Sequence, residues 1–206
     1  MYRYLTLIVV CSLSIAAARS EGIDPNDAVA AQRIAIGTCA TCHGPHGQSI
    51  SPKFPVLAGQ HANYLAAQMH GFKDQKRGDP DALGYMWGMA ANLDDATIAA
   101  LADYYSRQPR HSGPKVAGAA LDRGKDLYLH GNTAEGIPAC AACHGANAEG
   151  TDAFPRLAGQ HMTYLTKQLR SFQSNLRDVA IMHGVAQGLK GEEMNDVAAY
   201  LQSLGP

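Results

Sequence analysis

The stretch Cys39-Ala40-Thr41-Cys42-His43 decides the fold of this 206-residue chain. Two cysteines separated by two residues and followed by histidine form the pattern of covalent haem attachment. Each thiol can bond one vinyl group of the porphyrin, and the adjacent imidazole can then ligate the iron. The pattern returns as Cys140-Ala141-Ala142-Cys143-His144, which predicts two covalently bound haem c groups. The predicted attachment residues are Cys39, Cys42, Cys140 and Cys143, and the predicted proximal ligands are His43 and His144.

A longer segment also occurs twice and indicates that the chain is an internal duplication. Phe54-Pro55-x-Leu57-Ala58-Gly59-Gln60-His61-x-x-Tyr64-Leu65 returns as Phe154-Pro155-x-Leu157-Ala158-Gly159-Gln160-His161-x-x-Tyr164-Leu165. The offset between the copies is 101 residues at the haem motifs, 100 in this segment and 96 at Tyr104 and Tyr200. Small insertions in loops explain this drift. Such self-similarity predicts two copies of one haem-binding unit of about 90 residues.

Hydrophobic periodicity predicts helices in each copy and no strand. The predicted helices cover residues 28–36, 61–72 and those after Asp94 in the first copy, and 121–130, 164–172 and 192–204 in the second. Gly37 is expected to end the first helix just before the haem motif. Residues 73–85 are expected to form a loop, as is the insertion 132–138. The predicted fold class is therefore all-α, with each haem forming a large part of a modest core.

The first 20 residues are typical of a secretory signal peptide. Arg3 precedes an apolar run from Leu5 to Ala18, and Ala16-Ala17-Ala18 suits a cleavage site. This run of about 14 residues is short for a membrane span, and an uncleaved N-terminal anchor is the alternative. Cleavage would remove Cys11 and leave four cysteines, all in the haem motifs. The predicted location is the periplasm, where unmodified thiols tend to oxidise.

The two copies are expected to form separate domains of equal charge. Residues 108–114 combine proline and glycine and cannot easily continue a helix, so residues 113–118 are the predicted linker. The first domain is then 21–112 and the second 119–206. Each side of the linker carries 8 basic and 9 acidic residues between Arg19 and the C-terminus. A net charge of −1 for the whole chain gives no argument for binding nucleic acid.

The duplication selects one methionine in each copy as the predicted distal iron ligand. Met86 and Met182 each lie seven residues before a matched leucine, Leu93 or Leu189, in a stretch expected to be a loop. Every other methionine of the repeat aligns with a residue that cannot ligate iron. These unmatched methionines are Met69, Met89, Met162 and Met194. Histidine with methionine gives a higher potential than two imidazoles do.

Bis-histidine ligation is the alternative, and it would use His61 and His161. These two histidines also coincide in the repeat, at the start of the middle helix of each copy. A helix start with exposed donors favours anions, so Gln60 and His61, with Gln160 and His161, can instead bind a haem propionate. A strongly negative potential for both haems would contradict the methionine assignment.

Further residues are candidates for supporting the two iron sites. The proximal histidines need a partner for their second ring nitrogen, and the carbonyls of Pro55 and Pro155 can supply it. The alternative is that these prolines only make the loops rigid. Tyr64 and Tyr164 are expected either to contact propionates or to pack in the core.

Two other chemistries of paired cysteines fit this sequence less well. A structural zinc site can be built from two Cys-x-x-Cys pairs, but the long gap between the pairs and the histidine after each argue against it. A thioredoxin-like dithiol needs one pair in a βαβ context, which the helical pattern does not offer. Haem attachment accounts for both motifs and for the matched methionines.

These motifs together resemble those of the dihaem cytochrome c4 family, over about residues 22–205. The resemblance implies two class I cytochrome c domains related by a pseudo-two-fold axis, with the haems approaching at the interface and propionates inward. It also implies electron carriage in a bacterial respiratory chain, from a donor such as a cytochrome bc1 complex to a terminal oxidase. Many members carry opposite charge on their two domains, and this sequence departs from that pattern.

Three functions are therefore considered for the chain. An electron carrier is favoured, because a methionine on each iron leaves no coordination position open for a substrate. An electron-transfer subunit of a sulfide- or sulfur-compound-oxidising dehydrogenase is the alternative, because one fold can serve several partners. A dihaem peroxidase would need one iron that can lose its sixth ligand, which matched methionines disfavour. Contact with a membrane is expected only through partners or through an uncleaved anchor.

Overall fold

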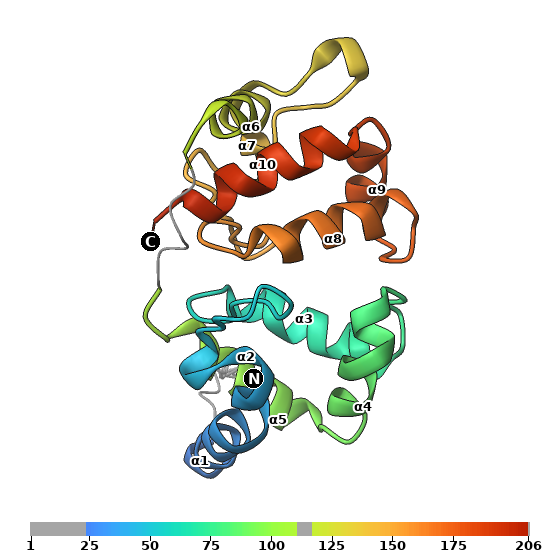
Figure 1. Ribbon diagram of the computed structural model, residues 1–206. Coiled ribbons are helices and arrows are strands. Elements are labelled where there is room, and N and C mark those ends of the chain that lie inside the picture. The colour runs from blue at the N-terminus through green and yellow to red at the C-terminus, as the bar shows by residue number, and fades with distance from the viewer. Residues whose placement is uncertain (1–23, 111–116, 206) are drawn as a thin grey trace, which may run out of the picture.

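The computed structural model describes residues 24–110 and 117–205, which fold into two helical halves that lie one above the other in the view of Figure 1. The predicted signal peptide and most of the predicted linker lie outside these residues. No helix within them is both long and apolar enough to cross a membrane. The longer helices of the first half are α1 (Pro25–Ile34), α3 (Ala62–Lys73) and α5 (Asp95–Ser106). Those of the second half are α6 (Ala119–His130), α8 (Met162–Gln173), α9 (Ala180–Gln187) and α10 (Gly191–Ser203).

The described residues contain no strand, as the sequence predicts, and only two isolated β-bridges. Short helical segments complete both halves around the haem motifs and methionines. They are α2 (Ala40–His43), α4 (Trp87–Ala90) and α7 (Ala141–His144), the π-helical segments Ala35–Cys39 and Ala82–Met86, and the 3-10 segments Pro45–Gly47 and Thr133–Glu135.

The first helix does not end at Gly37, so that prediction is wrong. Asp24 caps α1 by accepting a hydrogen bond from the Asn26 amide at 2.7 Å, and the chain stays helical through the haem motif. A glycine costs a helix only about 1 kcal/mol, and tertiary packing overrides that preference here. Helix α2 ends instead at His43 and is capped by Gly44, whose φ of +73° favours glycine. His43 is therefore the last residue of a continuous helical segment that begins at Pro25.

The predicted loops are wrong at the two methionines, since both methionines lie in helical segments, although residues 74–79 of the first loop are not helical. Met86 ends a π-helical segment that leads directly into α4, and Met182 lies in α9. Pro80 begins the helical turn that leads into the first of these segments. Proline is tolerated in the first turn of a helix, where its missing N–H is not needed. A proline that favours a loop by composition therefore starts a helix in this context.

Each half builds its core where its first and last helices cross. In the first half α1 packs on α5, and in the second half α6 packs on α10 (Figure 1). The second core is centred on Tyr128, Met194 and Leu201, which are almost completely buried. The contact between α6 and α10 is so close that Gly124 lies directly against the Asp196 carbonyl.

Replacing Gly124 with alanine is expected to destabilise the second half. A Cβ at this position would lie 2.0 Å from the Asp196 carbonyl oxygen, so α6 and α10 would have to move apart. Overpacking of this kind costs about 1–3 kcal/mol, more than the helix gains when alanine replaces glycine. Urea unfolding of the holoprotein measures this loss. Gly191→Ala is the control, because nothing lies within 4 Å of its new Cβ, and equal stability of both variants would contradict the prediction.

Candidate haem-binding site

A single cavity of about 1050 Å³ extends through both halves and contains both haem motifs. Its lining includes the cysteine and histidine residues of each motif. These are Cys39, Cys42 and His43 from the first half, and Cys140, Cys143 and His144 from the second. No disulfide joins these four cysteines to one another. The predicted attachment residues therefore surround one space that is large and mostly apolar in its lining.

The two motif histidines are held in the same way. Nδ1 of His43 lies 2.9 Å from the carbonyl oxygen of Pro55, and Nδ1 of His144 lies 3.0 Å from that of Pro155. Donation from Nδ1 fixes the tautomer and leaves the Nε2 lone pair available to a metal. Burial lowers the pKa of both histidines, which favours the neutral ring that ligation requires. The two proline carbonyls therefore orient the imidazole rings through Nδ1.

Burial also affects the thiols of the first cysteine in each motif. It raises the pKa of Cys39 above its ordinary value and that of Cys140 to about 11. Both thiols are therefore neutral at physiological pH, and neither is activated as a redox dithiol would be.

The cavity also separates the methionines into two groups. Met86 and Met182 both line it, as a distal ligand must. Met69 and Met89 line it as well, although the repeat gave no reason to place them there. Met194 is 1% exposed and belongs to the core of the second half. The first half therefore offers several sulfur atoms to its part of the cavity.

Two buried arginines line the cavity at the contact between the halves, and they are absent from the residues predicted above. Arg77 donates to Gln68 and Gln168, and Arg177 donates to the same two side chains, at 2.7–3.0 Å. Arg177 also donates to the Tyr64 hydroxyl at 2.7 Å. The signal in the sequence was that each arginine follows its matched glutamine by nine residues.

This cluster fits the acidic substituents of haem. Among the described residues, Asp79 is the one carboxylate that forms an ion pair with these two guanidinium groups, so the cluster has one positive charge in excess. Nε of Arg177 is buried and has no hydrogen-bond partner. A buried charge without compensation is costly, so an anion in the cavity would stabilise the cluster. The residues present are therefore compatible with haem in polarity as well as in volume.

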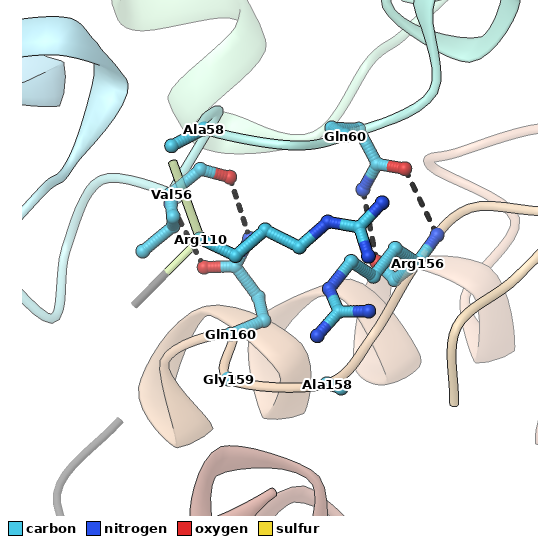
Figure 2. Close-up of a pocket in the computed structure, with 8 residues that line it drawn as sticks. All are labelled: Val56, Ala58, Gln60, Arg110, Arg156, Ala158, Gly159 and Gln160. Carbon is cyan, nitrogen blue, oxygen red and sulfur yellow. Dashed lines mark hydrogen bonds between the residues drawn. The ribbon is translucent and has the colours of Figure 1, made fainter. Parts of the chain in front are cut away.

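Gln60 and Gln160 join the two halves through reciprocal hydrogen bonds (Figure 2). The Gln60 amide bonds the backbone N–H and C=O of Arg156, and the Gln160 amide bonds those of Val56, each at 2.9 Å. Each glutamine side-chain amide thus both donates to and accepts from the backbone of the opposite half, as another peptide group would. Both also line the cavity.

His61 and His161 contact the opposite half rather than the cavity. Nε2 of His61 lies 2.9 Å from the Glu149 carbonyl, and Nε2 of His161 lies 2.8 Å from the Ser49 carbonyl. Neither histidine is among the residues that line the cavity. This geometry gives no support to bis-histidine ligation. Tyr64 and Tyr164 do line the cavity, and Tyr64 is bonded to Arg177 across the interface.

Replacing Gln60 with alanine is expected to weaken the contact between the halves. The change leaves the buried N–H and C=O of Arg156 without partners, and each unsatisfied group costs about 1–3 kcal/mol. We expect a lower unfolding midpoint and faster proteolytic cleavage between the halves. Gln48→Ala is the control, because Gln48 makes one exposed bond of 3.3 Å within the first half. Equal cleavage rates in the two variants would refute the role of the glutamine pair.

The chain matches known proteins along almost all of its length. The Cytochrome c family model matches residues 28–106 and 121–205, which is one match in each half. The protein named cytochrome c4 from Azotobacter vinelandii is 40% identical, over 86% of this chain and 89% of that protein. The chain belongs to the cytochrome c4 family. A cytochrome c4 of this kind has two tandem cytochrome c domains, in agreement with the two helical halves.

Other relatives agree with this cytochrome c4 assignment. Cytochrome c-552 from Acidithiobacillus ferridurans is 41% identical, over 99% of this chain and 90% of that protein. A thiosulfate dehydrogenase electron acceptor from Thiomonas intermedia is 35% identical, over 100% of this chain and 94% of that protein. The solved cytochrome c4 of Acidithiobacillus ferrooxidans has a TM-score of 0.77 at 42% identity, covering 81% of this chain and 98% of that one.

As a cytochrome c4, the chain binds two covalently attached haem c groups, and its four motif cysteines fit the attachment pattern. When bound, each haem supplies an iron that changes between the ferric and ferrous states. The chain supplies a buried, mostly apolar cavity, two oriented imidazoles and a positively charged cluster. It is a dihaem electron carrier like its relatives.

Proposed function

We propose that this cytochrome c4 carries electrons, one per haem, in a bacterial respiratory chain outside the cytoplasm, toward a terminal oxidase. The proposed location is the periplasm, reached through an N-terminal signal peptide. The proposed donor is a redox protein such as a cytochrome bc1 complex. These assignments rest on membership of the family and on the chemistry of the iron sites.

The proposed iron ligands are His43 with Met86 in the first half and His144 with Met182 in the second. The observation that carries the proposal is that all four side chains line the same cavity, with both histidines held through Nδ1. An iron with imidazole on one side and thioether on the other has no open position. It then exchanges electrons without binding a substrate, which favours a carrier over a peroxidase.

A spectrum of the native protein tests this proposal directly. The pyridine form should show two haems per chain, and the oxidised native form should show a sulfur-to-iron charge-transfer band. The reduced protein should not bind carbon monoxide at neutral pH. Rapid binding of carbon monoxide by the native protein, or the lack of the sulfur band, would instead favour an enzyme with an open iron.

A second function is supported by the thiosulfate dehydrogenase electron acceptor to which the whole chain is similar. In this function the cytochrome accepts electrons from a dehydrogenase that oxidises a sulfur compound. The two functions differ in the donor and not in the iron chemistry. Reduction of the purified oxidised cytochrome by such a dehydrogenase with thiosulfate would support the second function, and rapid reduction by a cytochrome bc1 complex alone would support the first.

A further inference from the structure

The residue that follows each proposed distal methionine lies outside the cavity lining and carries a hydrogen-bond donor. Met86 and Met182 line the cavity. Trp87 and His183, which come next in the chain, are not among the residues that line it. Consecutive residues of a helix are rotated by about 100°, so one can face a cavity while the next faces the protein. Both following residues are half-buried and have a ring N–H. Each half therefore places a donor directly behind its proposed iron ligand.

In the first half the donor is the Trp87 indole. Its Nε1 donates to the Arg77 carbonyl oxygen at 2.7 Å, in the loop that follows α3. The same indole packs in one cluster with Phe72 of α3 and with Met86. An indole N–H can only donate, and a half-buried indole without an acceptor would be costly. This hydrogen bond thus fixes the segment that carries Met86 to the backbone beyond α3.

In the second half the donor is the His183 imidazole, on α9. Its Nδ1 lies 2.7 Å from the Phe172 carbonyl oxygen, which belongs to the last turn of α8. A carbonyl oxygen only accepts, so Nδ1 carries the proton, and Nε2 accepts from the Gln187 side-chain amide at 2.9 Å. Carbonyls in the last turn lie at the negative end of the helix dipole and accept readily from histidine. His183 therefore joins the helix of Met182 to α8.

The two donors occupy the same place in the repeat although their chemistry differs. Trp87 donates to a carbonyl ten residues earlier in the chain, and His183 to one eleven residues earlier. An indole and an imidazole differ in size, shape and polarity, and the feature that they share is a ring N–H. A residue that served only to fill space would not need to donate in both halves. The hydrogen bond itself is therefore the property that the two halves have in common at this position.

We propose that Trp87 and His183 are positioning residues that keep the methionine sulfurs on the two irons. A thioether binds ferric iron less tightly than ferrous iron, so the oxidised protein is the form in which another ligand competes best. Such a ligand can take the sixth position only if the segment that carries the methionine moves outward. That movement breaks the hydrogen bond of the following ring, and the bond therefore opposes displacement. This inference rests on the proposed ligands Met86 and Met182, but not on which proteins act as donor and acceptor.

The test in the second half is His183→Phe, which keeps an aromatic ring and removes its N–H. Imidazole is titrated into the oxidised holoprotein at one neutral pH, and the loss of the sulfur-to-iron band is followed. Losing one hydrogen bond should make displacement at the second haem about two- to tenfold easier. His183→Asn is the rescue variant, because its side-chain amide can donate from nearly the place of Nδ1. It should restore most of the native resistance to imidazole.

Trp87→Phe is the matched variant of the first half, and it also removes only a ring N–H donor. The two haems are distinguished by repeating the titrations in the Met182→Ala background, where the remaining sulfur band belongs to the first haem. In that background Trp87→Phe should ease displacement by a similar factor. His183→Phe should leave the remaining band as resistant as before, because its effect is confined to its own half.

Gln173→Ala is the control for a general loosening of α9. Gln173 of α8 donates to the Ala186 and Leu189 carbonyls, each at 2.9 Å, near the end of α9. Its loss should lower the unfolding midpoint and leave the displacement by imidazole close to native.

The proposal is overturned if His183→Phe resists imidazole as the native protein does, or if Gln173→Ala loses its band as easily as His183→Phe. It is also overturned if His183→Asn behaves as His183→Phe does. Should His183→Phe fail to retain both haems, Trp87→Phe decides by the same criterion. A native protein without the sulfur band would instead contradict the proposed ligands, so the two failures are distinguishable.

Discussion

Met182→Ala is expected to remove the sulfur-to-iron charge-transfer band of the second haem and to open that iron to carbon monoxide. No other methionine of the second half lines the cavity, among the residues that the structure describes. The alanine methyl group cannot ligate a metal, so water or an added ligand would take the sixth position. Losing a thioether ligand should also lower the potential of this haem, because the thioether favours the ferrous iron. Visible spectra and carbon monoxide titration measure these effects.

Met194→Ala is the matched control for this prediction. Met194 belongs to the same half and is buried in the core rather than in the cavity lining. Its loss should destabilise the protein by about 2–5 kcal/mol and leave the sulfur band unchanged. If Met182→Ala keeps the full band, the second iron has a different distal ligand. The same experiment on Met86 is less decisive, because Met69 and Met89 also line the first half of the cavity.

The internal repeat predicted the architecture well because it compares the chain with itself. Helical periodicity in both copies gave the all-α fold and the order of the helices. The errors lie where a local signal competes with packing, as at Gly37, which stays helical, and at Pro80, which starts a helix. A single sequence shows these residues as helix breakers. Only the surrounding contacts decide whether they act as such.

The repeat selected candidate site residues one by one, but it did not predict their contacts across the interface. The repeat selected the motif histidines and proposed the proline carbonyls that their rings contact. It also selected Gln60 and His61, but it gave no reason to expect that they would bond the opposite half. Two copies packed about a two-fold axis present the same surface to each other, so matched residues meet near that axis. Repeated residues therefore belong to the interface as well as to the haem site, and sequence alone does not separate the two roles.

Removing the second attachment site with Cys140→Ala and Cys143→Ala is expected to unfold the second half. Without the second haem, about half of the cavity of about 1050 Å³ would be empty. At about 24 cal/mol per Å³, an empty half would cost up to about 12 kcal/mol. A unit of this size has about 5–13 kcal/mol of stability in total. The empty half should therefore collapse or unfold, with the loss of about half of the helical circular dichroism signal and rapid proteolysis beyond the linker.

The first half serves as the internal control, because its own motif is unchanged in this variant. It should keep one haem per chain and resist proteolysis, although the partners of Gln60 in the second half would be lost. Thr41→Ala provides a second control, since it alters an exposed residue between two cysteines and leaves both thiols in place. A stable, fully helical variant with one haem would show that the protein core alone maintains the second half. The haem would then contribute little to the stability of that half and would not be the larger part of its core.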